Sequence, residues 1–212
     1  HNLAKISLAT GNADATWDPN VDADIGKMAL SPTGDTIYFY GGFSNVNGAT
    51  GRNNVAAVRT SGTGVATAFN PGGPGAVTTR LILVSPDGNY VYIGFNAINQ
   101  NVGGGTVNFF AAMNAADGTL APMTPGFNQG AFAAAIVGTD LYLGGQFTQT
   151  TDGGSTVQKL AKFDASSGWG NPQLVATWNN TSATRPDGDI RAILYSNTDA
   201  FPMLYLGGGV SN

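Results

Sequence analysis

The amino-acid sequence predicts an all-β fold made of four repeated modules of four strands, and three observations support this prediction. Charged residues make up 10% of the chain and glycine accounts for 31 of its 212 residues, a composition that suits short strands and tight turns better than solvated helices. The apolar segments are short and are bounded by Gly, Pro, Asn and Ser, as β-strands are. A set of sequence markers also recurs with a period of about 53 residues, which indicates a repeat architecture.

The first marker is a string with apolar residues at its first and fourth positions and alanine at its second. It reads Leu-Ala-Lys-Ile at 3–6, Val-Ala-Ala-Val at 55–58, Phe-Ala-Ala-Met at 110–113 and Leu-Ala-Lys-Phe at 160–163. A glycine and then a large aromatic residue beside Asn or Asp follow each string; these aromatics are Trp17, Phe69, Phe127 and Trp178. An apolar strand that ends in glycine completes each copy, at Gly41, Gly94, Gly144 and Gly207.

Hairpins joined by Ser-Pro turns are the clearest elements within a copy. Residues 25–30 and 36–40 flank the turn Ser-Pro-Thr-Gly at 31–34, and residues 80–84 and 90–93 flank Ser-Pro-Asp-Gly at 85–88. Proline at the second turn position and glycine at the fourth favour a β-turn, so we expect each pair of segments to form a hairpin. The strings at 3–6 and 160–163 predict further strands, and a short outer strand is expected before Trp17 and Trp178.

Modules of this kind predict a β-propeller. A small four-stranded sheet cannot bury both of its faces alone, but sheets stacked face to face around an axis cover one another. The recurring aromatics Trp17, Phe69, Phe127 and Trp178 are expected to fill the space between blades in equivalent environments. The glycine doublet Gly41–Gly42 would let two backbones approach where a Cβ would clash.

The matching motifs are Tyr-Gly-Gly-Phe at 40–43, Asn-Gly at 47–48, Arg-Asn-Asn-Val-Ala at 52–56 and Phe-Asn-Pro at 69–71. Together they resemble the delta-60 repeat, a propeller repeat of secreted and surface bacterial proteins. The order Gly-Gly, Phe163–Asp164, Trp178 is also similar to kelch repeats. The resemblance covers the whole chain and implies a propeller in an exported protein, but its motif positions are structural and imply no activity. The second copy departs from the pattern with Gly94–Phe95, and the third copy lacks the proline.

The phase of the repeat predicts three complete blades, over residues 25–70, 77–128 and 131–178. Residues 190–212 would supply two inner strands, and residues 2–18 would supply two outer strands. These halves would pair with each other in a closed four-bladed ring, or belong to different blades of a larger propeller. We favour the larger propeller, and interpret the chain as a segment of a longer protein, because members of such families usually carry more repeats.

Composition argues against several classes of function. The net charge is −4 and the nine Lys and Arg residues are spread along the chain, so neither nucleic acid nor an anionic membrane is an expected partner. No apolar run is long enough to span a bilayer. The chain has no cysteine and its one histidine is His1, which argues against zinc, copper and a histidine-activated nucleophile. The glycines at 103–105 lack the Lys-Ser/Thr of a phosphate-binding loop, and we expect a flexible loop there. We therefore predict no enzymatic activity.

Calcium is the most plausible ion. Acidic and amide side chains alternate over a short stretch, at Asp18, Asn20, Asp22 and Asp24. Alternating oxygen ligands are typical of calcium loops, although Ala23 departs from the EF-hand pattern. An ordinary polar loop is the alternative. Segments 152–154 and 187–189 are weaker candidates.

Carbohydrate binding would use an exposed aromatic residue beside polar groups. Trp169 lies outside the repeat pattern and is the candidate ligand platform, whereas Trp17 and Trp178 are expected to pack between blades. Paired carboxylates for glycoside hydrolysis are not evident, because acids such as Asp87 and Asp117 lie in turn contexts. Asn179 and Asn180 begin two overlapping glycosylation sequons.

The sequence therefore favours a non-catalytic structural or interaction module of a larger secreted or cell-surface protein. Its expected partners are a protein or glycan at the cell surface and other domains of the same parent chain, with no cofactor other than calcium. Two alternatives stay open. One is an extracellular carbohydrate-binding or carbohydrate-active propeller, with carboxylates and an exposed tryptophan in one cleft. The other is a subunit of an extracellular assembly in which neighbouring copies complete its open edges.

Overall fold

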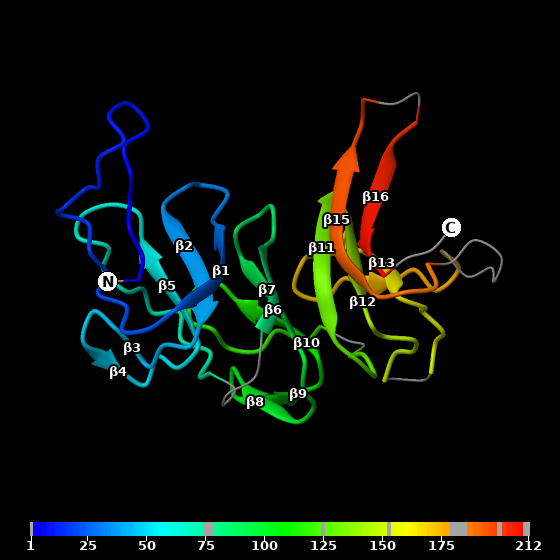
Figure 1. Cartoon of the computed structure of the whole chain (residues 1–212). Coiled ribbons are helices and arrows are strands. Elements are labelled where there is room, and N and C mark those ends of the chain that lie inside the picture. Colours follow the sequence, from blue (N-terminus) through cyan, green and yellow to red (C-terminus); the bar gives the residue numbers. More distant parts are fainter. Residues whose placement is uncertain are drawn as a thin grey trace.

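The computed structural model describes residues 2–73, 79–123, 126–151, 154–178, 186–198 and 201–209. All the regular secondary structure in these ranges is β-strand, which confirms the predicted all-β class. The strands form four antiparallel sheets in chain order and two small hairpins (Figure 1). Within this part of the chain there is accordingly no helix with the length and apolar character needed to cross a membrane.

The first three sheets are antiparallel meanders, and the fourth is a two-stranded hairpin. The first sheet contains β1 (Ile25–Leu30), β2 (Thr36–Gly41) and β5 (Val55–Arg59). The second contains β6 (Thr79–Val84), β7 (Tyr90–Phe95) and β10 (Phe110–Asn114). The third contains β11 (Ala131–Val137), β12 (Asp140–Gly145), β13 (Leu160–Asp164) and β14 (Gln173–Leu174), and the fourth contains β15 (Ile190–Ser196) and β16 (Met203–Gly208). In the first two sheets a short outer segment pairs with the third strand through the isolated bridges Val58–Ala66 and Met113–Leu120. This segment takes the place that β14 has in the third sheet.

Two small hairpins extend from the loops between the second and third strands of a sheet. They are β3 (Asn45–Val46) with β4 (Ala49–Thr50), and β8 (Gln100–Val102) with β9 (Gly105–Val107). Asn47 and Gly48 turn the first hairpin with φ of 54° and 73°, and Gly103 and Gly104 turn the second with 58° and 82°. The flexible loop expected at Gly103 is therefore wrong, because two-residue turns with positive φ close hairpins tightly.

One backbone turn recurs in three sheets just before the third strand. The turn residues Asn54, Phe109 and Lys159 have φ of 65°, 62° and 64°. Their N–H groups donate to the carbonyls of Phe43, Ala97 and Phe147, and their own carbonyls accept from the N–H groups of Gly41, Phe95 and Gly145. Positive φ is uncommon outside glycine and is tolerated only where the surrounding bonds hold it. The repeat is thus preserved in the hydrogen bonds as well as in the sequence.

The sheets pack against one another in chain order. β1 contacts β6, β6 contacts β11, and β11 contacts β15. One hydrophobic cluster joins the first and second sheets and a second joins the second and third, with Ile93 central to the first and Leu143 to the second. A third cluster covers the outer face of the first sheet with Leu3, Trp17 and Val21. In Figure 1 the first sheet and the β15–β16 hairpin lie on opposite sides of the molecule.

The four recurring aromatics all pack against a sheet face. Phe69 meets the edge of Tyr38 at 5.0 Å between ring centroids, and Trp178 meets Tyr142 in the same way at 5.2 Å. Tyr38 on β2 and Tyr142 on β12 each pair with the third residue of the third strand of their sheet, so they occupy equivalent positions. Phe127 is buried in the second cluster, and Trp17 is buried in the third, where its indole N–H donates to the carbonyl of Arg59.

The strand register corrects the alignment of the glycine doublets. The start of the first strand pairs with Gly41 in the first sheet, Gly145 in the third and Gly208 in the fourth. Tyr40 therefore takes the place of Gly144 and Gly207, and Gly42 lies outside the strand. The physical reason is a difference in side-chain size: Gly26 is the unpaired residue before Lys27, the partner of Tyr40, and it leaves room for the Tyr40 ring, because a Cβ on Gly26 would lie 2.6 Å from Tyr40 Cε2.

Residues 2–18 and the β15–β16 hairpin occupy the two ends of this row of sheets. Residues 2–18 form a loose hairpin with a single bridge between Ile6 and Ala13, and Leu3 and Trp17 anchor it on the first sheet. β16 pairs with β15 alone among the described strands. The two segments expected to supply halves of blades are therefore not paired with each other.

Candidate functional site

A polar groove of about 820 Å³ lies between the first and second sheets. Its walls are the turn between β1 and β2, the turn between β6 and β7, and the loops that follow β5 and β10. The lining is dominated by carboxylates, hydroxyls and amides, among them Asp35, Asp87, Asn89, Asn114 and Asp117. Such a wall offers hydrogen bonds to a polar ligand.

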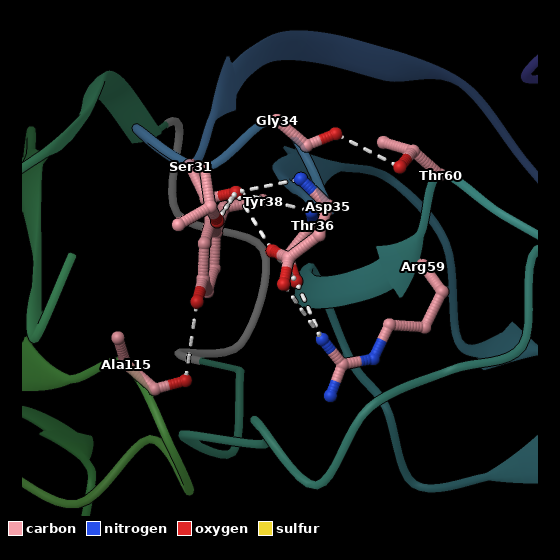
Figure 2. A network of polar contacts seen from close by, with 9 residues as sticks. Ser31, Gly34, Asp35, Thr36, Tyr38, Arg59, Thr60 and Ala115 are labelled. Carbon is pink, nitrogen blue, oxygen red and sulfur yellow. Dashed lines mark hydrogen bonds and ion pairs between the residues drawn. The ribbon is translucent and has the colours of Figure 1, made fainter.

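Ser31 organises the first wall of the groove (Figure 2). Its hydroxyl accepts hydrogen bonds from the N–H groups of Asp35 at 3.2 Å and Thr36 at 3.1 Å, and donates to Asp35 Oδ1 at 3.0 Å. Arg59 donates to Thr36 Oγ1 at 3.1 Å and pairs with Asp35 at 3.5 Å. Tyr38 crosses to the second sheet, where its hydroxyl donates to the carbonyl of Ala115 at 3.3 Å. The wall is therefore fixed from both sheets.

The second wall repeats the first because the turn has the same sequence pattern. Ser85 Oγ accepts from the N–H of Tyr90 at 3.0 Å and donates to the Asp87 carboxylate. Gly34 and Gly88, at the fourth position of the two turns, both have φ of 74°, which glycine adopts without strain. Both serines are buried, and each hydroxyl is hydrogen-bonded within its own turn.

The carboxylates of the groove are held in their ionised form. Hydrogen bonds from Thr36, Thr33 and Ser31 lower the pKa of Asp35. The backbone and side chain of Thr119 lower the pKa of Asp117. Partial burial raises the pKa of Asp87, but hydrogen bonds from Ser85 and Asn89 outweigh it and leave that pKa lowered. A glycosidase needs one carboxylic acid with a raised pKa as proton donor, whereas the pKa of each of these three groups is lowered.

A second cavity, of about 150 Å³, lies at the other end of the first strands. It is lined by Lys27, Tyr40, Arg80, Phe132 and Arg191. Three of the nine Lys and Arg residues, which are spread along the sequence, meet here. Each of the three lies one or two residues after the start of the first strand of its sheet. Aligning those strand starts would have been the sequence signal for this cluster.

The proposed calcium residues lie along the loop that leads into β1. Asp22 accepts from the N–H groups of Ser44 and Asn45 at 2.9 and 3.1 Å, and these bonds lower its pKa. Asp18 accepts from the N–H of Asn20 at 2.9 Å, while Asp24 offers its carbonyl to Gly42. In the described ranges no three Asp, Glu or His side chains are grouped to hold a metal. A calcium ion held by these residues stays a prediction.

Asp189 belongs to the weaker calcium candidate at residues 187–189. Its carboxylate accepts a hydrogen bond from Gln146 Nε2 at 2.7 Å and pairs with Lys159 at 3.2 Å, so it joins the third and fourth sheets. Trp169 is half-buried against the second cluster, and its carbonyl accepts from the Tyr92 hydroxyl at 2.6 Å. Among the described residues that line the groove there is no tryptophan. Asp152, Gly153 and the sequons at Asn179 and Asn180 lie outside the described residues.

Known proteins add no assignment to this geometry. A scan against protein-family models gives no match to the chain, and a search of curated proteins gives none either.

Proposed function

We propose that the chain is a non-catalytic interaction module, an arc of β-propeller blades in a larger secreted or cell-surface protein, of the type formed by delta-60 and kelch-like repeats. One observation carries this proposal: four antiparallel sheets follow one another, and the first strand of each contacts the first strand of the next. Blades arranged around an axis have this order. Rigid sheets of this kind hold loops in place as binding surfaces, with a cell-surface protein or glycan, or other domains of the parent chain, as partners.

The two end faces of the row support an arc that continues in both directions. Ile82 and Val84 on β6 are buried against the first sheet. By register, Met28 and Leu30 are their counterparts on β1, and they are 56% and 57% exposed. At the other end, Leu194 and Tyr205 face outward and are 66% and 51% exposed. Each end therefore exposes apolar positions of the kind that the neighbouring sheet covers elsewhere.

Among the described strands β16 pairs with β15 alone, and the string at residues 3–6 has the sequence expected of a third strand beside it. β12 pairs with β13 through Tyr142–Lys162 and Leu143–Ala161. The same register would pair Tyr205 with Lys5 and Leu206 with Ala4. A strand of this sequence would turn the β15–β16 hairpin into a sheet like the third one. Because residues 2–18 lie at the far end of the row (Figure 1), a second copy can supply that strand more readily than the same chain.

Engineered cysteines test this pairing, since the chain has none of its own. Two double variants are needed, Lys5→Cys with Tyr205→Cys and Ala4→Cys with Leu206→Cys. The Cα–Cα distance between opposite residues alternates between two values along an antiparallel ladder, so one of the two cysteine pairs has a distance that suits a disulfide. After oxidation, we expect a disulfide between copies that increases with protein concentration, read by non-reducing electrophoresis and intact mass. Tyr142→Cys with Lys162→Cys is the matched control and should oxidise within one chain.

The other outcomes are equally decisive. A disulfide within one chain at every concentration would mean that the row closes into a four-bladed ring, against the larger propeller. A control that oxidises while neither test pair reacts would show that β16 does not accept this strand and would sink the arc. Ordered oligomers without oxidation would favour the alternative of a subunit of an extracellular assembly.

Carbohydrate binding is a second candidate function, favoured by the polar groove. Ionised carboxylates, the amides of Asn89 and Asn114 and the ring of Tyr90 line one cavity. These groups suit the hydroxyls and the apolar faces of a sugar chain. The lowered pKa values of the carboxylates favour a lectin-like role over a carbohydrate-active one.

Calorimetric titration with cellohexaose and chitohexaose tests the second candidate. If the groove binds either sugar, Asp87→Asn should weaken binding about tenfold, because a charge-assisted hydrogen bond is lost. Asp14→Asn, on the hairpin of residues 2–18, is the matched control and should bind as the parent does. Absence of binding to both sugars, or equal binding by both variants, would remove this candidate. Release of reducing ends would instead indicate hydrolysis.

A further inference from the structure

We propose that the cavity at the starts of the first strands is a binding site for a small oxyanion or carboxylate. Five side chains from all four sheets line it: Lys27, Tyr40, Arg80, Phe132 and Arg191. Three of them are cations in a chain whose net charge is −4. The site does not depend on how many blades the parent protein has, since every lining residue belongs to the described sheets.

A β-bulge directs a side chain into this cavity in three of the four sheets. The register of the first strand shifts at the same step in each sheet, and the extra residues are Gly26, Arg80, Phe132 and Arg191. Bulges point a side chain out of the regular ladder and are common at binding sites. In the first sheet the extra residue is glycine, and Tyr40 from the next strand fills its place. The bulge therefore places Arg80, Phe132 and Arg191 at the cavity, and Lys27 and Tyr40 complete its lining.

The cations in this cavity have little countercharge. The guanidinium carbons of Arg80 and Arg191 lie 6.0 and 5.6 Å from the centre of the Phe132 ring. Arg191 pairs with Asp189 at 3.5 Å, but that carboxylate is shared with Lys159. No carboxylate in the described ranges lies within ion-pair distance of Lys27 or Arg80. Like charges that converge repel one another, and a bound anion would offset this repulsion.

The lining also defines the class of anion. Two guanidinium groups offer planar pairs of N–H donors, which match the oxygens of a carboxylate, sulfate or phosphate. Burial raises the pKa of the Tyr40 phenol, although Arg80 opposes it, so the hydroxyl stays protonated as a further donor. The buried Phe132 ring keeps one side of the cavity apolar, which strengthens ionic contacts beside it. A volume of about 150 Å³ suits a single small anion.

Calorimetric titration with sodium sulfate and with sodium malonate tests the site, with ionic strength held constant by sodium chloride. The two probes distinguish a tetrahedral oxyanion from a carboxylate. We expect saturable binding of at least one probe, weakened about tenfold by either Arg80→Gln or Arg191→Gln, because each removes a charge-assisted contact. Lys5→Gln removes a cation on the hairpin of residues 2–18 and should leave the affinity unchanged.

Two results would overturn the proposal. One is heat that never saturates with either probe, and the other is equal affinity in Arg80→Gln, Arg191→Gln and Lys5→Gln. Sulfate stabilises folded proteins in general, so a rise in melting temperature shared by all variants does not count as evidence for the site. Circular dichroism without anion checks that each variant folds. If Arg80→Gln does not fold, Arg80→Lys is the substitute variant. It keeps the positive charge but loses the paired N–H donors of the guanidinium, so it should still bind sulfate more weakly than the parent.

Discussion

Replacing Phe127 with alanine is expected to lower the free energy of unfolding by about 3–5 kcal/mol, the usual cost of deleting a buried aromatic ring. Phe127 is fully buried. Its ring stacks on Phe147 at 4.1 Å and meets the edges of Phe110 at 6.0 Å and Phe163 at 6.1 Å. Phe110 belongs to β10 and Phe163 to β13, so the ring joins the second and third sheets. Its loss would leave a cavity at the contact that holds the row together.

Urea unfolding followed by tryptophan fluorescence measures this loss. The matched control is Phe201→Ala, because Phe201 is 76% exposed and surface truncations usually change stability by less than about 0.5 kcal/mol. Two separate unfolding transitions in the Phe127 variant would mean that the sheets uncouple before they unfold. Similar losses in the two variants would contradict the packing described here.

Elements whose hydrogen bonds are encoded within a few residues could be predicted from the sequence. The expected segment 25–30 coincides with β1, and the expected segments around the second Ser-Pro turn lie within β6 and β7. Ser31 bonds Asp35 and Thr36, and Ser85 bonds Asp87 and Tyr90. Such turns close on themselves, so their sequence pattern is sufficient to locate them. The Asn-Gly sequence at 47–48 is also typical of a tight hairpin turn. Interpreted only as a motif of the repeat, it does not predict the β3–β4 hairpin.

Features that depend on the register between strands could not be predicted in the same way. The position of Gly41 relative to Gly144 follows from which residue pairs with the start of β1, and a shift by one residue exchanges the two glycines of a doublet. The cavity lined by Lys27, Arg80 and Arg191 has the same origin. Arg80 and Arg191 are bulge residues and Lys27 follows the bulge of β1, so these three residues, far apart in the sequence, are brought together by the register of their strands. The polar groove likewise depends on how two sheets face each other.

Gly41→Ala is expected to destabilise the chain by about 3 kcal/mol or more, at the upper end of what overpacking costs. A Cβ at Gly41 would lie 1.8 Å from the carbonyl oxygen of Asp24 and 2.9 Å from the Cα of Ile25. These are backbone atoms at the start of β1, so they cannot rotate away as a side chain can. The same carbonyl accepts the N–H of Gly42 at 2.9 Å, and moving it would break that hydrogen bond.

Gly42→Ala is the matched control, because it adds the same methyl group one residue later. No atom lies within 4 Å of a Cβ built on Gly42, and its φ is not in the left-handed region. We expect unchanged stability or a gain of up to about 1 kcal/mol, since alanine reduces the conformational entropy of the unfolded chain. Urea unfolding of both variants measures the difference. Equal stability of the two would mean that Gly41 does not make the close backbone contact at the start of β1, and that the doublet is aligned with Gly144–Gly145 after all.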